Sequence, residues 1–465
     1  MIGFFKINDP IRLAMILVLL FIVRIPLVLL DFPLLRPELS WFLIGEKIND
    51  GWVMYKDLDD NTGVFSAMIY GFVDLIAGRS TAVFQGLNIF IVFVQAILLN
   101  YTINENNLLK SKTYVPALLY VVSASIFFDF YTLSPPMMAT TFLIISLRYL
   151  FQQMKQQKKD SSVYMMGFYI GVAGLFYTPA ILFIFLLLFS VLLYSSSSLR
   201  SLLLVFVGFL FPLITVGLYY YWNNALGLYL TDILFYSFTQ LDYWYLSSTG
   251  ILFLAVIPIV MMVWAVLRLS AGTGYVNYQL NTRLVMIFYI VIAIVTFFVS
   301  PKKSAYHLFL FVPAMAYILG DYFLNIKSAF IRGLQFYSFS LIVWALGYMY
   351  DDSPFLKNSL VSSQNIVVNA EKYDKVGKVL VLGDDVDYYM NNTLATGYLN
   401  WQVAKQHFKD LSYLPQLIGI HENFLKELPD AIIDKEKVMP SVFDRLPDLR
   451  DIYYLDKDGI YYRYK

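Results

Sequence analysis

One stretch of the sequence, residues 34–79, gathers acidic side chains between apolar segments. Its carboxylates of interest belong to Glu38, Asp57, Asp59 and Asp60. Flanking amphipathic segments would hold these charges at a membrane surface, where a charge is unfavourable and usually serves a purpose. Carboxylates can take up a proton during a reaction. If the protein has an active site, we expect it in this stretch.

The composition defines the class of protein that must position these residues. Apolar residues make up 59% of the chain and charged residues only 14%, against about 25% charged residues in soluble proteins. Apolar runs of roughly 18 or more residues recur, and such runs are long enough to cross a bilayer as helices. The sequence therefore predicts an α-helical polytopic membrane protein in contact with membrane lipids.

Charge and residue usage exclude several classes of function. The net charge of +1 gives no basic footprint for nucleic acid. The chain has no cysteine, which excludes disulfides, thiol nucleophiles and thiolate metal sites. Its three histidines are scattered, which does not suit a zinc site. We therefore expect no nucleic-acid partner.

Eleven apolar segments are predicted to span the membrane, and the first runs from Ile11 to Leu30. The others lie near residues 82–101, 113–130, 134–151, 163–177, 179–195, 201–222, 250–268, 284–300, 306–323 and 334–350. The segment from Val64 to Gly78 is short and contains Asp74, so it would not cross about 30 Å of hydrocarbon. We place it in the membrane interface, within a first outer loop of residues 31–81.

Charge placement orients these spans. If the N-terminus is cytoplasmic, every inner connection carries lysine or arginine, as the positive-inside rule expects. The outer connections near residues 130–136, 177–179 and 223–249 contain neither. Lys302 and Lys303 break this pattern because they fall on the outer side. An odd number of spans sends the C-terminal region outward.

Residues 351–465 differ in composition from the predicted membrane domain of residues 1–350. Charged residues occur throughout, and short apolar runs at residues 378–383 and 431–434 suit strands. The turn Asp456-Lys457-Asp458-Gly459 between two apolar runs predicts a hairpin. We predict a small extracytoplasmic α/β domain, on the same side of the membrane as the loop from Arg36 to Gly63.

The order of motifs resembles a known family. The outer loop contains Arg36-Pro37-Glu38-Leu39-Ser40-Trp41, then Tyr55-Lys56-Asp57 and Asp60-Asn61, and ends with Gly78-Arg79-Ser80. A later stretch runs from Lys302 to Leu308, with Pro313 following. This order, over roughly residues 10–350, resembles the GT-C superfamily of membrane glycosyltransferases, in its bacterial protein-mannosyltransferase-like and aminoarabinose-transferase-like branch.

The resemblance implies a GT-C-like fold and a reaction. A sugar would pass from a polyprenyl-phosphate donor to a lipid or protein acceptor, on the outer face of a bacterial inner membrane. Glu38 matches the second residue of the family's Asp-Glu pair and is implied as the general base. Asp60 corresponds to the acid that opens the family's acidic-Lys-Pro-Pro box.

The resemblance also implies residues that hold the donor. Lys302 and Lys303 would meet the donor phosphate, and Tyr306 would hydrogen-bond it. Some relatives bind a divalent cation, for which Asp57 and Asp59 are the candidates. A transferase must hold base and leaving group near one bond, so we expect the carboxylates and the lysines to converge on one outward-facing cavity.

Two departures from the family pattern leave a second function open. Pro37 stands where the family has Asp, and Asn61-Thr62-Gly63 stands where it has Lys-Pro-Pro. The protein is then either an active divergent enzyme that relies on Glu38, or a catalytically degenerate GT-C-like scaffold. Such a scaffold would be a subunit of a cell-envelope complex with a membrane-protein partner.

The same residues also have structural explanations. Glu38 could pair with Arg36 or Lys47 at a helix start, an interaction worth under about 1 kcal/mol. The aspartates could form a solvated turn before the interfacial helix. Lys302 and Lys303 could extend to lipid headgroups.

Overall fold

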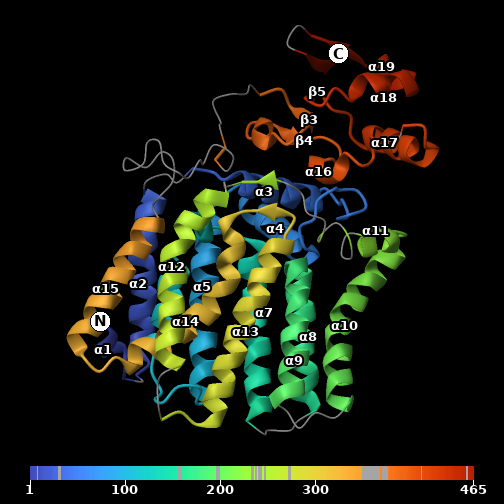
Figure 1. The fold of residues 1–465 in the computed structure, drawn as a ribbon. Coiled ribbons are helices and arrows are strands. Elements are labelled where there is room, and N and C mark those ends of the chain that lie inside the picture. Colours follow the sequence, from blue (N-terminus) through green and yellow to red (C-terminus); the bar gives the residue numbers. More distant parts are fainter. Residues whose placement is uncertain are drawn as a thin grey trace. The chain divides into compact units, whose positions relative to one another are not determined.

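The computed structural model describes most of the chain in two compact units (Figure 1). The described residues are 1–7, 9–29, 33–155, 160–194, 199–231, 235, 238, 243–245, 248–270, 274–347, 367–368, 375–409, 411–456 and 459–464. The first unit comprises Met1–Phe32, Thr81–Tyr219 and Phe238–Asn365. The second comprises Pro33–Ser80, Tyr220–Ser237 and Ile366–Lys465. Both units are therefore interleaved along the chain.

The first unit is built from helices, and its long helices run roughly side by side in Figure 1. Their bounds are α1 (Ile2–Phe5), α2 (Ile11–Leu29), α5 (Thr81–Glu105), α6 (Val115–Ser123), η1 (Phe128–Tyr131), α7 (Pro135–Met154), α8 (Asp160–Phe176), η2 (Thr178–Phe183), α9 (Ile184–Tyr194), α10 (Leu199–Trp222), α12 (Ser248–Ser270), α13 (Asn277–Val299), η4 (Ala305–Phe311), α14 (Val312–Asn325) and α15 (Ala329–Gly347). Two short strands, β1 (Tyr243–Trp244) and β2 (Lys302–Lys303), pair in parallel.

Six helices of the described part of the chain are long and apolar enough to cross a membrane. They are α5, α10, α12, α13, η4 with α14, and α15. The protein is thus an integral membrane protein, but the predicted number of eleven spans is not confirmed. The predicted span 113–130, for example, is interrupted because α6 ends at Ser123. There the Ser125 hydroxyl donates to the Val121 carbonyl at 2.9 Å, a local bond that competes with helix continuation.

A buried arginine joins three parts of the first unit. Arg24 of α2 donates to the Asn88 side chain of α5 and, at 2.9 Å, to the Ala124 carbonyl at the end of α6. The Asn88 amide in turn donates to the carbonyls of Phe130 and Thr132, at 2.9 and 2.6 Å. These partners satisfy a charge that would be unfavourable alone inside an apolar helix bundle.

Glycines allow α8 and α10 to approach closely. A Cβ added at Gly167 of α8 would collide with the Val205 carbonyl oxygen, and one at Gly208 of α10 would collide with the Tyr164 carbonyl oxygen. Small residues at such contacts let helix backbones meet within a membrane. This pair of helices therefore requires glycine at both positions.

The second unit begins with two packed helices, α3 (Arg36–Asn49) and α4 (Val64–Ala77). The backbones approach where Gly45 faces the Tyr70 carbonyl oxygen, which would lie 2.6 Å from an added Cβ. The rings of Trp41 and Tyr70 stack with centroids 5.5 Å apart. Helix α11 (Leu226–Thr231) also belongs to this unit. The helix predicted for the membrane interface is present as α4.

A five-stranded sheet with surrounding helices forms the C-terminal part of the second unit. The strand order is β4-β3-β5-β7-β6, with β3 parallel to β4 and β5, and β7 antiparallel to β5 and β6. The strands are β3 (Lys378–Leu382), β4 (Thr393–Leu394), β5 (Ala431–Asp434), β6 (Tyr453–Leu455) and β7 (Ile460–Arg463). The helices are η6 (Val386–Tyr389), α16 (Trp401–Ala404), α17 (Leu414–Lys426), α18 (Met439–Arg445) and α19 (Pro447–Arg450).

This α/β part confirms the predicted fold class. The predicted apolar runs form β3 and β5, and the predicted hairpin forms β6 and β7. Alternate side chains bury Leu380, Leu382 and Ile432 in the core between sheet and helices. The turn residues Lys457 and Asp458, the start of the outer loop at residue 31 and the predicted domain boundary at residue 351 lie outside the described residues. Those domain boundaries remain a prediction.

Candidate functional site

Glu38 lies in the first turn of α3 and is almost completely buried, with 3% of its surface exposed. Its Oε2 accepts a hydrogen bond from the Leu35 backbone N–H at 3.2 Å, as in a capping box. Pro37 just before it suits the first turn of a helix, where its missing N–H leaves no bond unmade. Pro37, which stands where the resembled family has aspartate, therefore helps to start α3, the helix that positions Glu38.

Asp60 is also buried and forms a tight turn ahead of α4. Its Oδ1 accepts the Thr62 backbone N–H at 2.8 Å. Burial raises the pKa of the Tyr70 phenol, and the negative charges of Asp60 and Glu38 raise it further. Both carboxylates thus act electrostatically on the same phenol. The structure brings these two predicted catalytic residues together within the second unit.

The backbone that carries the aspartates is strained at Tyr55. This residue has a φ of 64°, in the left-handed region that non-glycine residues seldom adopt. Its N–H donates to the Leu58 carbonyl at 3.0 Å, and its hydroxyl donates to the Thr62 carbonyl at 2.8 Å. Its ring stacks on that of Tyr220, with centroids 5.8 Å apart. The loop is thus held in one shape, and such strain occurs at functional sites.

Asp57 and Asp59 each meet a basic side chain of the C-terminal part. Asp57 Oδ1 lies 2.9 Å from the Lys426 ammonium, and Asp59 Oδ2 lies 3.2 Å from His407 Nε2. The hydrogen bond that His407 donates to the Asp59 carboxylate raises the pKa of His407 against the opposing effect of burial. Across the described residues, no group of three or more acidic, histidine or cysteine side chains could hold a metal ion. The divalent cation remains a prediction, and we derive no step through it.

Lys303 has a clear structural role in the first unit. Its ammonium donates to the carbonyls of Phe297 and Phe298, at 3.1 and 2.6 Å, and to that of Ser300. These carbonyls lie at the C-terminus of α13, where helical partners are lacking and a positive charge is favourable. Burial lowers the pKa of Lys303 to about 8. An ammonium has three donors, so Lys303 uses its donors on the helix end, and Lys302 is the more accessible of the two lysines.

Tyr306 is positioned by a residue that the sequence analysis did not single out. Asp129 is fully buried and accepts the Tyr306 backbone N–H at 2.7 Å and the Ser304 hydroxyl at 2.8 Å. It thereby fixes the segment that follows β2. The signal was present in the sequence, because Asp129 is a lone charge within a run of aromatic and apolar residues.

The predicted site residues fall in both units. Glu38 and Asp60 belong to the second unit, whereas Lys302, Lys303 and Tyr306 belong to the first. The expectation that they share one outward-facing cavity therefore stays a prediction. Within each unit, the residues are held by the local contacts described above.

A network of ion pairs joins the outer loop to the C-terminal domain within the second unit. Arg36 forms a bidentate pair with Asp387, with distances of 2.7 and 2.8 Å. Arg79 pairs with Glu46 and donates to three carbonyls of residues 389–392. These contacts are what the prediction of a shared side of the membrane requires, and the side itself stays a prediction. Sequence reasoning missed these pairs because 351 residues separate Arg36 from Asp387.

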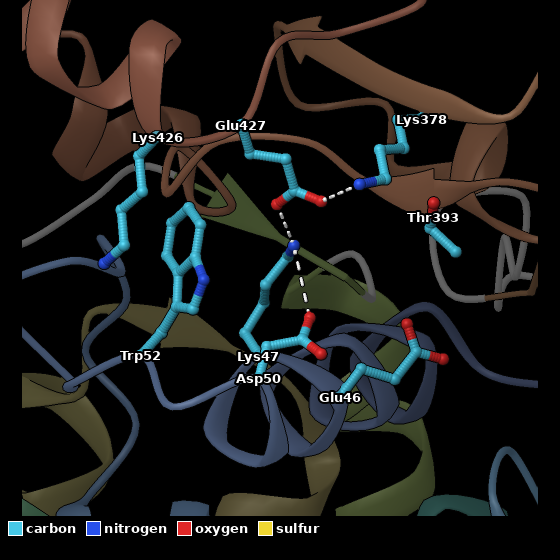
Figure 2. Close-up of a pocket in the computed structure, with 8 residues that line it drawn as sticks. All are labelled: Glu46, Lys47, Asp50, Trp52, Lys378, Thr393, Lys426 and Glu427. Atoms are coloured by element: carbon cyan, nitrogen blue, oxygen red, sulfur yellow. Dashed lines mark hydrogen bonds and ion pairs between the residues drawn. The ribbon is translucent and has the colours of Figure 1, made fainter.

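A polar cavity of about 480 Å³ lies along this network (Figure 2). Glu427 bridges Lys47 and Lys378 there, and Lys47 also lies 3.6 Å from Asp50. Burial alone would raise the pKa of Glu427, but the hydrogen bonds and charges of the two lysines outweigh it, so the pKa lies below its ordinary value. These charges largely compensate one another. The cavity therefore offers no excess charge for a phosphate.

The ring of Trp52, in the same cavity, already contacts two lysines. The ammonium groups of Lys47 and Lys426 lie 4.7 and 4.3 Å from the centre of its ring, as cation–π contacts. Trp52 is buried, so its faces are not open for stacking on a sugar. This cavity is best described as a seam between loop and domain.

Comparison with solved structures finds proteins that are similar to this chain. The apo oligosaccharyltransferase of Archaeoglobus fulgidus is similar, with a TM-score of 0.50, 9% identity and coverage of 90% of this chain and 69% of that chain. ArnT from Cupriavidus metallidurans, bound to undecaprenyl phosphate, has a TM-score of 0.49 and 11% identity, over 72% of this chain and 64% of that chain. AglB from Archaeoglobus fulgidus, in complex with an inhibitory peptide and a dolichol-phosphate, has a TM-score of 0.49 and 8% identity, over 98% of this chain and 74% of that chain.

The chain thus spans less than two thirds of the length of ArnT. At these identities the likeness to the oligosaccharyltransferase, which is a GT-C glycosyltransferase, shows the fold alone. The helices and this likeness define an integral membrane protein with a GT-C-like fold, as the sequence predicted. Within that class, the chain belongs to the family described as "Family of unknown function (DUF6427)", which matches residues 54–352. No curated protein matches the sequence.

Proposed function

We propose that this protein transfers a sugar from a polyprenyl-phosphate donor to a lipid or protein acceptor at the outer face of a bacterial inner membrane. The observation that carries the proposal is the pair of buried carboxylates, Glu38 and Asp60, beside Tyr70. Burial of a carboxylate is unfavourable unless its surroundings compensate for it, and such groups concentrate at functional sites. The GT-C-like fold supports the same proposal.

In this reaction Glu38 is the general base. An acceptor hydroxyl or amine attacks the anomeric carbon of the sugar while Glu38 takes up its proton. The bond between the anomeric carbon and the phosphate oxygen breaks, and polyprenyl phosphate leaves with the bonding electrons. Hydrogen bonding within the first turn of α3 holds the Glu38 side chain in place for this step.

The departing phosphate needs a cation near the bilayer surface. Among the predicted donor residues, Lys302 suits this role better than Lys303, because Lys303 already donates to three carbonyls. Tyr306 follows on the same segment, which Asp129 holds in place. A divalent cation at Asp57 and Asp59 is part of this proposal only as an additive to be tested in the assay.

The first experiment compares Glu38→Gln with Glu46→Gln, a glutamate on the same helix. Purified protein is incubated with labelled polyprenyl-phosphate sugars and an envelope lipid extract, with and without a divalent cation. Loss of a general base lowers turnover by about 10²- to 10⁴-fold, whereas Glu46→Gln should retain turnover. Equal activity of Glu38→Gln and wild type would exclude Glu38 as the base.

A second comparison separates the two lysines. We expect Lys302→Gln to weaken the use of donor while the protein keeps its unfolding temperature. Lys303→Gln should lower the unfolding temperature, because three carbonyls at the end of α13 lose their donor. The reverse pattern would assign the phosphate to Lys303.

A non-catalytic role is the second candidate, and one observation favours it. The outer loop carries the residues that we propose as catalytic. Ion pairs and backbone hydrogen bonds connect this loop to the C-terminal domain; for example, the Asp59 N–H donates to the Gly397 carbonyl at 2.8 Å. Such an arrangement suits a rigid scaffold in a cell-envelope complex. Stable co-purification with another membrane protein, without turnover of any donor, would favour this role over transfer.

A further inference from the structure

A second cavity, of about 510 Å³, lies in the first unit, at the ends of α12, α14 and α15. Its cations are Lys110, Arg268 and Lys327. No carboxylate occurs among the described residues that line it. We propose that this cavity binds the phosphate of an anionic phospholipid. This inference does not depend on the proposed transfer reaction.

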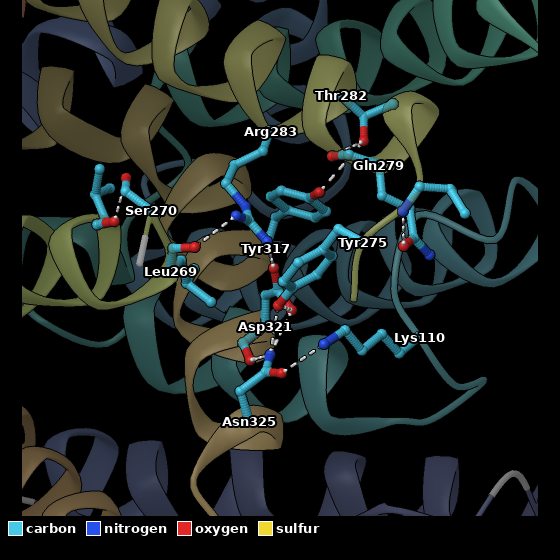
Figure 3. A network of polar contacts seen from close by, with 12 residues as sticks. Lys110, Leu269, Ser270, Tyr275, Gln279, Thr282, Arg283, Tyr317, Asp321 and Asn325 are labelled. Carbon is cyan, nitrogen blue, oxygen red and sulfur yellow. Dashed lines mark hydrogen bonds and ion pairs between the residues drawn. The ribbon is translucent and has the colours of Figure 1, made fainter. Parts of the chain in front are cut away.

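Asp321 bonds to two lining residues, Tyr275 and Asn325, but its charge is paired with a different cation. Its Oδ2 lies 2.7 Å from the Arg283 guanidinium, and its Oδ1 accepts from the Tyr275 hydroxyl and the Asn325 amide, each at 2.9 Å (Figure 3). These contacts pair the Asp321 charge with that of Arg283, at a buried position. Among the described residues that line the cavity, three are therefore cationic and none is acidic.

Aromatic rings hold two of these cations in place. The Lys110 ammonium lies 4.0 Å from the centre of the Tyr275 ring, and the Arg268 guanidinium lies 4.6 Å from that of Trp264. The Trp264 indole donates to the Tyr322 hydroxyl at 3.1 Å. Cation–π contacts position a cation without cancelling its charge. An arriving phosphate would thus meet cations whose side chains are already ordered.

The surroundings of the cavity favour a lipid over a soluble anion. Ile331 lines the cavity and is 48% exposed, and Phe330 and Leu334 of the same helix are 78% and 58% exposed. The cavity therefore combines cations with an apolar helix surface that acyl chains can cover. Lys110, Arg268 and Lys327 also belong to the connections that the charge pattern assigns to the cytoplasm, where basic pockets between spanning helices bind anionic headgroups.

The test uses native mass spectrometry of the full-length, delipidated protein with three probes. These are phosphatidylglycerol, phosphatidylcholine and inorganic phosphate. The pocket variant carries Lys110→Gln, Arg268→Gln and Lys327→Gln. The matched control carries Lys112→Gln, Lys155→Gln and Arg200→Gln, which remove the same charge from the same predicted side of the membrane but do not line the cavity.

We expect phosphatidylglycerol to bind wild type and control equally, and to bind the pocket variant at least about tenfold more weakly. Phosphatidylcholine should bind all three weakly. A further variant that keeps the charges, with Lys110→Arg, Arg268→Lys and Lys327→Arg, should retain binding, which guards against misfolding of the glutamine variant.

Three results would overturn the proposal. Equal loss in pocket variant and control would indicate general surface charge. Equal binding of the two phospholipids would remove the role of the anionic headgroup. Tighter binding of inorganic phosphate than of phosphatidylglycerol, at equal concentration, would make the ligand a soluble anion and not a lipid.

Discussion

The bidentate pair of Arg36 and Asp387 is a largely buried contact between the outer loop and the C-terminal domain. The Asp387 side chain is 2% exposed and that of Arg36 is 15% exposed. Removal of one partner from a buried pair leaves an uncompensated charge, at a cost of about 3 kcal/mol or more. We expect Asp387→Asn to make the C-terminal domain markedly more sensitive to limited proteolysis.

An exposed ion pair provides the control for this variant. Arg200 and Asp160 form a pair in the first unit whose side chains are 74% and 59% exposed. Such pairs contribute at most about 1 kcal/mol, so Asp160→Asn should leave the proteolysis pattern unchanged. Similar digestion of both variants would contradict a special role for Arg36 and Asp387.

Glu427 predicts a pH dependence of stability. Its pKa is lower in the folded protein than its ordinary value of 4.5, because Lys47 and Lys378 favour the carboxylate despite burial. The stabilisation is therefore fully present above that ordinary value and is lost as the pH falls through the lower folded pKa. We expect the unfolding temperature to decrease below about pH 4.5, and Glu427→Gln to weaken that dependence. Glu422→Gln, an exposed change in α17, the helix that ends just before Glu427, should leave that dependence unaltered.

At the scale of elements, the contact of α8 with α10 depends on glycine. We expect Gly208→Ala to lower the unfolding temperature, because the added Cβ collides with the Tyr164 carbonyl oxygen. Gly86→Ala on α5 is the matched control, since a Cβ there meets nothing within 4 Å. In a helix that control gains about 0.5–1 kcal/mol of propensity. A stabilising effect at both positions would contradict the close packing of these two helices.

Elements were predictable from the sequence where a local pattern defines them. Long apolar runs predicted the helices, and alternating apolar residues with a turn signal predicted β3, β5 and the β6–β7 hairpin. The early end of α6 was missed because the apolar run continues past Ser123, so hydropathy gives no sign that the helix stops there. The contacts of Arg36 and Lys47 could not be predicted, since their partners are distant in sequence and every charged residue of the domain was an equal candidate.

The candidate site also combines features that a local sequence pattern predicts with contacts that it does not predict. The sequence singled out Glu38 and Asp60, which lie together because α3 and α4 pack as neighbours. It did not reveal that Lys303 caps α13 or that Asp129 holds the segment of Tyr306. In both contacts the partner is a backbone group. Every residue type has such a group, so the sequence does not show which residue will be the partner.

At the scale of the whole molecule, the absence of cysteine allows a direct test of topology. Single cysteines at the exposed positions Lys56 and Glu436 should both react with a membrane-impermeant maleimide in intact cells, because loop and C-terminal domain are predicted to share one side. A cysteine at Lys155 should react only after permeabilisation. Labelling of just one of the first two would refute the shared side.

The interleaved second unit has a consequence for biosynthesis. Arg36 precedes Asp387 by 351 residues, so at about 5–20 residues per second the ribosome reaches Asp387 roughly 18 to 70 s after Arg36. If the loop lies on the outer side, as the charge pattern predicts, it is exported during that interval while the charges that will meet it are still untranslated. The exported loop must therefore wait in a half-assembled state, open to chaperones and proteases of that compartment, until the last quarter of the chain arrives. A premature stop within the C-terminal domain would leave this loop permanently in its vulnerable form.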